Sequence, residues 1–205
     1  MRDPRVGGEV RRPSLSSIPV TQPRERALVR RLRYLRDWEL ANVLVVPAMV
    51  ALIWKVGGDP ANTWGRRAIG VAAVSYVLLQ GGVYWYLKLA AVRARHRALP
   101  AWFPGVFETF HRTNLPAFAA IAVWMILSPA PTGSGMSSDL PWGLALVAFA
   151  ALEHVNYYEH QLMHDTEQDM AYLRRYRRLR SPSLRQDLSR AAASPSSRTH
   201  SALPP

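Results

Sequence analysis

The apolar stretch WELANVLVVPAMVALIWKV, residues 38–56, is long enough and apolar enough to cross a membrane as one helix. Trp38 and Trp54 stand near its two ends, as aromatic side chains do at the membrane–water interfaces. Asn42 and Pro47 interrupt it, and in lipid such residues usually face neighbouring helices. The stretch therefore predicts one helix of a larger membrane-embedded bundle.

Three more apolar stretches follow, at residues 67–91, 114–128 and 140–160. The third predicted span, 114–128, is short, because a bilayer needs about 20 helical residues. Asn114 is a plausible N-cap for this span, with Pro116 in its first turn. The preceding segment, 100–113, places three phenylalanines on one helical face and predicts a short helix lying in the interface.

The fold expected from these stretches is all-α, a membrane-embedded four-helix bundle formed by residues 38–178. The fourth helix is expected to continue past the membrane into residues 172–180. The two ends of the chain, residues 1–23 and 179–205, are rich in Arg, Pro and Ser without periodicity, and we expect them to be disordered.

The chain has 205 residues, with 26 Lys and Arg against 14 Asp and Glu. Its mean hydropathy, −0.08, is close to neutral only because apolar blocks alternate with arginine-rich gaps. Arginines that flank apolar spans are required by topology, so the basic excess favours a membrane over nucleic acid as the partner. The absence of cysteine excludes disulfides, thiol chemistry and Cys-ligated metals.

The segment RERALVRRLRYLR, residues 24–36, precedes the first span. It makes up nearly all of a juxtamembrane helix that we predict for residues 24–37. Its leucines fall at helical spacing and its arginines fill the other faces, so it is either an amphipathic helix lying on an anionic leaflet or a positive topogenic flank. The predicted lipid contacts are Arg24, Arg26, Arg30, Arg31, Arg33 and Arg36.

Four crossings would place both chain ends and the loop after residue 91 on one side of the membrane. That side carries 16 Lys and Arg residues near the spans, and the other side carries 3, namely Lys55, Arg66 and Arg67. The basic side is cytoplasmic by the positive-inside rule. The expected location is the bacterial inner membrane, with both termini in the cytoplasm.

The fourth span carries the polar pattern with most chemical content. At about 100° per residue, one helix face gathers Glu153, Asn156, Tyr157, His160 and His164, and the opposite face carries Val155, Tyr158 and Leu162. A carboxylate inside a span must pair or face water, so Glu153 is expected to point into the bundle, toward Asn42, Gln80 or the region of Tyr84.

Three interpretations of this face remain open. His160 and His164 stand one turn apart and can bind one divalent metal, with Glu108 and His111 as candidate further ligands. Glu153 can instead lie in a proton or ion pathway. In the third interpretation, the polar side chains pack and hydrogen-bond between helices. The small and amide side chains at mid-membrane depth on the second span favour this interpretation. With Asn42 of the first span, the predicted packing residues are Ser75, Gln80, Gly81 and Gly82.

Two short segments, LEHVNYYEHQL at residues 152–162 and YWYLK at residues 84–88, resemble small bacterial four-span membrane proteins of no assigned activity. The resemblance implies a fold and no substrate or cofactor. The sequence thus predicts a multi-pass membrane protein, foremost a non-enzymatic accessory or scaffold subunit with a protein partner or a second copy beside it. The alternatives are a metal-dependent membrane enzyme using His160 and His164, and a small oligomeric transporter with Glu153 in its path.

Overall fold

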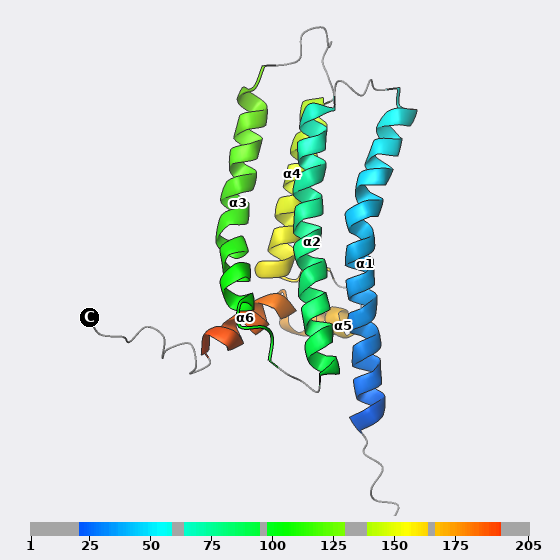
Figure 1. Cartoon of the computed structure of the whole chain (residues 1–205), viewed down its shortest axis with the longest axis vertical. Helices are drawn as coiled ribbons and strands as arrows, with labels where there is room; N and C mark the ends of the chain where they lie inside the picture. Colours follow the sequence, from blue (N-terminus) through cyan, green and yellow to red (C-terminus); the bar gives the residue numbers. More distant parts are fainter. Residues whose placement is uncertain (1–20, 59–63, 95–97, 130–138, 164–166, 194–205) are drawn as a thin grey trace, which may run out of the picture.

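The computed structural model describes residues 21–58, 64–94, 98–129, 139–163 and 167–193, and this part of the chain is all-α. Four long helices run side by side: α1 (Thr21–Val56), α2 (Gly65–Arg93), α3 (Phe103–Leu127) and α4 (Asp139–Tyr158) (Figure 1). Two short helices, α5 (Glu167–Tyr176) and α6 (Ser183–Ala193), lie at the end of the bundle where α1 begins. We call this the α6 end, and the opposite one the Asp139 end.

Helix α2 is the central element, because it packs against both α1 and α4, and α3 packs in turn against α4. The contact between α2 and α4 is close because small residues face each other. A Cβ atom at Gly70 would lie 2.7 Å from the Cβ of Leu146 and 2.9 Å from the carbonyl oxygen of Gly143. Only hydrogen fits there, so the two backbones approach more closely than larger side chains would permit.

At the Asp139 end, one carboxylate connects helices that are distant in sequence. Asp139, the first residue of α4, accepts hydrogen bonds from the backbone N–H groups of Arg66 and Arg67 at 3.1 Å each. These are unpaired N–H groups of the first turn of α2, so Asp139 caps that helix from outside it. The Arg67 guanidinium also forms a 3.6 Å ion pair with Asp139 and lies 5.1 Å from the ring centre of Trp54 of α1.

At the α6 end, helix α6 packs against the bundle through apolar contacts and through hydrogen bonds of a charged residue. Leu184 and Leu188 are buried, and α6 packs against α3 and α4. Asp187 accepts hydrogen bonds from the hydroxyl of Tyr84 and from Nζ of Lys88, both at 2.8 Å and both from α2. Between α4 and α6, the chain forms a loop from residue 161 to residue 180, and α5 is part of this loop.

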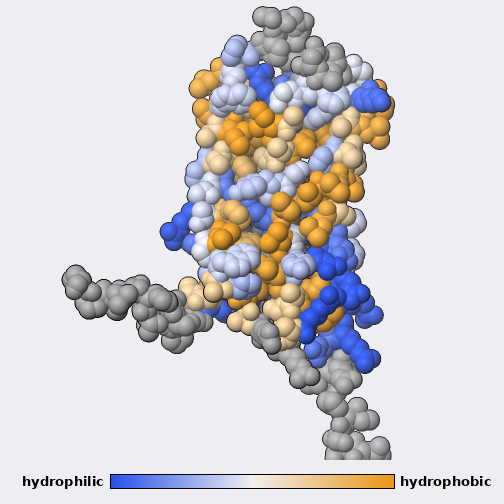
Figure 2. All heavy atoms as spheres, in the orientation of Figure 1, coloured by the Kyte–Doolittle hydropathy of each residue, from blue (hydrophilic) through white to orange (hydrophobic). Residues whose placement is uncertain are grey.

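The surface of the long helices is apolar to an extent unusual for a folded domain (Figure 2). By length and composition, α1 (Glu25–Val56) and α2 can cross a membrane. Among the described residues, these two helices are the ones that meet both conditions. Exposed large apolar side chains nevertheless occur on all four helices: Leu44, Val45, Met49, Leu52 and Ile53 of α1, Leu79 and Val83 of α2, Val123, Trp124, Ile126 and Leu127 of α3, and Trp142, Phe149 and Leu152 of α4.

Several element boundaries predicted from the sequence need correction. Residues 24–37 and 38–56 form one continuous helix, α1, rather than an in-plane helix followed by a span. The interfacial segment and the third span are likewise continuous in α3 from Phe103 to Leu127, because the buried contacts of Asn114 outweigh the low helix propensity of Asn114 and Pro116. Asn114 is therefore no N-cap; it lies buried in the middle of α3.

The fourth helix also ends earlier than expected, at Tyr158, and does not continue into residues 172–180. The reason is local: Asn156 Oδ1 accepts the backbone N–H of Leu162 at 2.8 Å, which turns the chain away from the helix axis. The predicted tail from residue 179 contains α6 instead, because Leu184 and Leu188 stand one turn apart and bury one face. Residues 1–20 and 194–205 lie outside the described residues.

The close contact at Gly70 gives a stability prediction. Gly70→Ala adds a methyl group against backbone of α4 and is expected to destabilise the bundle by about 1–3 kcal/mol through overpacking. Gly65→Ala, in the same helix with nothing within 4 Å of its added Cβ, is the matched control and should be neutral or slightly stabilising. Thermal unfolding of the two variants in detergent measures the difference, and equal midpoints would contradict the packing described.

Candidate functional site

Four buried polar side chains meet where α2, α3 and α4 converge, and we call them the inner polar cluster: Gln80, Asn114, His154 and Tyr158. Nδ2 of Asn114 donates to Oε1 of Gln80 at 3.0 Å and contacts Nδ1 of His154 at 3.2 Å. The hydroxyl of Tyr158 donates to the same Gln80 oxygen at 3.1 Å. Each side chain is at most 4% exposed, so the cluster is inside the bundle and joins three helices.

The protonation of His154 follows from this geometry. With the Asn114 amide as donor, Nδ1 of His154 is the acceptor, and the ring proton belongs on Nε2. Nε2 of His154 and Nε2 of Gln80 have no hydrogen-bond partner within the described residues. The cluster therefore holds two buried donors that a small polar molecule could bridge.

The inner polar cluster continues to the α6 end through stacked rings. The rings of His154, Tyr158 and His111 of α3 form a triangle: the ring centre of Tyr158 lies 4.6 Å from that of His154 and 5.3 Å from that of His111, and the two histidine rings are 5.9 Å apart. Nε2 of His111 in turn contacts Oε1 of Glu159 at 2.6 Å, just beyond the end of α4. The hydrogen bond with His111, and then Arg185 of α6, keep the pKa of the Glu159 carboxyl below its ordinary value.

The face of α4 that points into the bundle coincides with the predicted polar face only at Tyr157, which is buried. The buried side is centred on His154 and Tyr158, and Tyr158, which we expected on the side away from the polar face, is only 1% exposed. Glu153 and Asn156 lie at the edge of this face, and His160 is exposed. The buried pattern Gly143, Leu146, Val147 and Ala150 has helical spacing, and its extension by one and two turns reaches His154 and Tyr158. That apolar pattern was the signal for the correct face.

Glu153 lies toward α1 rather than toward Gln80. Its carboxylate accepts a 3.4 Å hydrogen bond from Nδ2 of Asn156, and it interacts electrostatically with Glu39 of α1, which the sequence analysis did not single out and which lies near the Tyr157 hydroxyl. The ring of Tyr157 covers Gly81 of α2, where an added Cβ would lie 2.6 Å from the ring. Two carboxylates and a phenol thus share the side of the bundle where α1 and α4 approach.

Of the residues proposed as metal ligands, the structure brings Glu108 and His111 together. His111 contacts Glu159 and, at 3.8 Å, Glu108, which also pairs with Arg112. In the ranges that the structure describes, no group of three or more His, Asp or Glu side chains could hold a metal ion. His164 lies outside the described residues, so the pair of His160 and His164 is not placed.

The predicted packing residues are distributed along two helices. Gln80 belongs to the inner polar cluster, Gly81 accommodates Tyr157, and Gly82 accommodates Leu40 of α1, whose Cδ2 would lie 2.6 Å from an added Cβ. Asn42 and Ser75 are half-buried. The sequence thus singled out a helix face that makes close contacts, but it did not indicate the partners.

The predicted lipid-binding arginines lie along the first four turns of α1. Arg26, Arg30, Arg31 and Arg33 are exposed, while Arg36 is half-buried and pairs with Asp37. The side chain of Arg24 lies outside the described part.

No family model, curated protein or solved structure matches this chain. The interpretation of the site therefore rests on its geometry.

The inner polar cluster yields a second prediction. Asn114→Leu keeps the approximate volume but leaves Gln80 and His154 without their shared donor, and should cost about 1–3 kcal/mol in stability. Tyr158→Phe keeps the ring stack and leaves Gln80 Oε1 with its Asn114 donor, so its cost should be smaller, about 0.5–1.5 kcal/mol. Denaturant unfolding of both variants gives the ranking, and the reverse order would contradict the network.

Proposed function

We propose that the chain is a four-pass protein of the bacterial inner membrane, with α1, α2, α3 and α4 each crossing the bilayer. The support is the exposure of large apolar side chains on all four helices, for example Leu44 at 74% and Leu127 at 77%. Only 11% of the apolar window of α1 is buried, whereas a core helix of a soluble protein would be mostly buried. Exposed apolar surface of this extent is stable when hydrocarbon covers it.

The distribution of charge supports cytoplasmic termini. Sixteen Lys and Arg residues flank the proposed spans at the α6 end, and three do so at the Asp139 end. Of these three, Arg66 and Arg67 are buried, with Asp139 and the carbonyl oxygens of Ser128 and Pro129 as partners. Of the three, only Lys55 is exposed. The difference in exposed positive charge between the two ends of the bundle is therefore larger than the residue counts suggest, and this difference sets the orientation of the helices in the membrane.

Within the membrane, we propose a non-enzymatic role as an accessory or scaffold subunit of a larger complex. The observation that carries this proposal is the use of the buried polar side chains: they bond to one another across helices. Gln80, Asn114 and Tyr158 join α2, α3 and α4. Such side chains stabilise one arrangement of the bundle, and its apolar outer surface remains available for a protein partner or a second copy.

A second candidate is a small oligomeric transporter, which the carboxylates of Glu39 and Glu153 favour. The two lie close enough to repel each other on the α1 side of α4, at the depth of the inner leaflet in the proposed topology. Intramembrane carboxylates mark ion and proton pathways in many transporters. Four helices enclose little space, so this function would require several copies. The remaining alternative, an enzyme with metal on His160 and His164, would need a third ligand other than His111, which contacts Glu159.

The topology gives a labelling prediction. Val56→Cys, at the exposed end of α1, should react with a membrane-impermeant thiol reagent added to spheroplasts, because it lies at the Asp139 end. Ala192→Cys, exposed on α6, should react only after the membrane is permeabilised. The chain has no native cysteine, so each variant carries a single reactive thiol. Labelling of Ala192→Cys in intact spheroplasts would reject cytoplasmic termini.

The proposed role predicts which variants keep function. In a strain lacking the native gene, His160→Ala/His164→Ala and Glu153→Gln should restore the wild-type phenotype at equal membrane abundance, because no described contact between helices depends on the His160 side chain or on the charge of Glu153. Asn114→Leu should lower abundance and phenotype together. The tagged wild-type chain should purify in mild detergent with a stoichiometric protein or with a second copy.

Failure of the histidine variant at normal abundance would favour the metal-dependent enzyme. Failure of Glu153→Gln alone would favour the transporter.

A further inference from the structure

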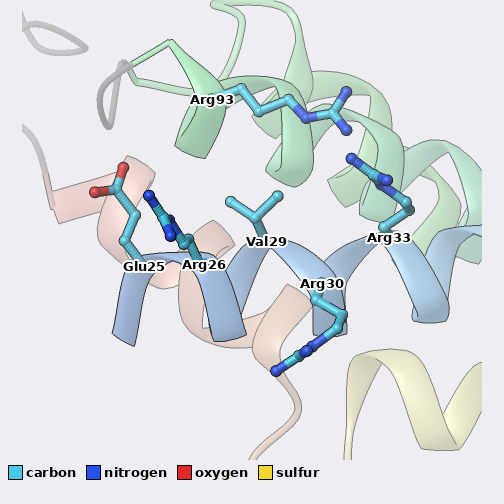
Figure 3. A pocket seen from close by; sticks show the side chains of 6 residues that line it. All are labelled: Glu25, Arg26, Val29, Arg30, Arg33 and Arg93. Carbon is cyan, nitrogen blue, oxygen red and sulfur yellow. The ribbon is translucent and has the colours of Figure 1, made fainter. Parts of the chain in front are cut away.

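A groove of about 600 Å³ lies between α1 and α2 at the α6 end of the bundle. Its lining is almost entirely basic: Arg26, Arg30 and Arg33 from α1, and Arg93 from α2, together with Val29 and Glu25 (Figure 3). Arg33 and Arg93 extend their guanidinium groups toward each other from the two helices, while Arg30 points away from Arg93. The groove thus gathers arginines that are 60 residues apart in the sequence.

The two walls of the groove are held together by a small apolar contact. Leu32 of α1 is buried against Leu89 and Val92 of α2, with Val29 packed beside them. Leu32 and Leu89 are 3% and 1% exposed, so this contact is as well buried as the main core. The arginines of the two helices are therefore kept in one place by the fold.

The charge of the groove is not neutralised by the part of the protein that the structure describes. Among the described residues, the structure contains no ion pair of Arg26, Arg30, Arg33 or Arg93 with a carboxylate, and the groove includes one acidic residue, Glu25. Like charges held together in this way raise the local positive potential and favour an anion. Guanidinium groups bind phosphate oxygens in a bidentate geometry, so two of them from opposite walls suit a phosphate group.

The depth of the groove matches the headgroup layer in the proposed topology, on which this inference rests. Trp38 is half-exposed at the start of the apolar part of α1, and Arg33 lies five residues before it, about 8 Å along the helix axis. On α2, Arg93 lies seven residues after the exposed Tyr86, about 10 Å. The polar headgroup layer is about 5–8 Å thick on each side of the hydrocarbon. Both arginines are thus placed at or just beyond the lipid phosphates.

We infer that this groove is a phosphate-binding site, formed by Arg33 and Arg93 with support from Arg26, and that it binds the headgroup of an anionic phospholipid of the cytoplasmic leaflet. The site differs from the predicted contact of a surface-lying helix with the membrane, because α2 contributes Arg93 and the apolar contact with Leu32 fixes its width. A zwitterionic lipid offers the same phosphate with an added cation, which the arginines would repel.

The test compares two double variants of the full chain with the same loss of charge. Arg33→Gln/Arg93→Gln removes the facing pair, and Arg31→Gln/Arg112→Gln removes two exposed arginines that do not line the groove. Both pairs are exposed, so neither double variant is expected to unfold the chain. The probes are phosphatidylglycerol and phosphatidylcholine, titrated onto the purified chain in neutral detergent, with bound lipids counted by native mass spectrometry.

We expect the wild type and the Arg31→Gln/Arg112→Gln variant to prefer phosphatidylglycerol, and the Arg33→Gln/Arg93→Gln variant to bind it at least about tenfold more weakly. Equal weakening in the two double variants, or no lipid preference in the wild type, would overturn the inference. A parallel titration with inorganic pyrophosphate distinguishes the source of the phosphate. Pyrophosphate binding that needs Arg33 and Arg93, without a preference for phosphatidylglycerol, would support the phosphate site but contradict a lipid as its ligand. Because these titrations contain no bilayer, they fail independently of the labelling experiment on topology.

Discussion

The carboxylate of Asp139 is the contact on which the arrangement of the helices depends. It caps the first turn of α2, binds the Arg67 guanidinium and begins α4, so one side chain sets where two helices start relative to each other. Arg67 carries the connection on to Trp54 of α1, and Arg66 carries it to the carbonyl oxygens that follow α3. With this end held, Gly70 and Gly143 bring α2 and α4 into backbone contact one turn farther along. A buried carboxylate of this kind is stable only because every one of its partners is a donor or a cation.

The polar side chains of the bundle form a gradient from one end to the other. Near the Asp139 end they neutralise each other; at mid-height, the inner polar cluster joins three helices with neutral hydrogen bonds; at the α6 end, Lys88, Asp187, Glu159 and Arg185 form ion pairs at the surface. Neutral hydrogen bonds thus occupy mid-height and charged pairs occupy the two ends; the pair of Arg67 and Asp139 is buried, and further hydrogen bonds to the Asp139 carboxylate stabilise it. The same gradient is expected of a bundle that lies in hydrocarbon with its ends in water.

The apolar runs and turn-rich gaps were sufficient to predict an all-α chain with four long helices, because helical length and hydrophobic spacing are properties of local sequence. They were insufficient for the continuity of α1 and α3, because an arginine-rich segment and a proline at 116 look like boundaries when tertiary packing is unknown. The predicted polar face of α4 lies to one side of the buried face and shares Tyr157 with it, because Glu153 and His160 were weighted more heavily than the apolar spacing that leads to His154. Glu39 and Asp139 act through partners more than 70 residues distant, and no pattern within one helix reveals such partners.

The segment between α4 and α6 begins and ends at one backbone hydrogen bond, from the N–H of Gln161 to the carbonyl oxygen of Arg180, at 2.9 Å. A chain that leaves and returns through the same point behaves as an insertion: its interior can change in length at a small entropic cost while its base stays closed. Helix α5 lies inside this closed loop, and α6 docks outside it, with its own contacts to Tyr84 and Lys88. Among the described helices, α5 is therefore the one that lies within a closed loop, where a replacement or a longer segment would leave the contacts of α6 with α2 in place.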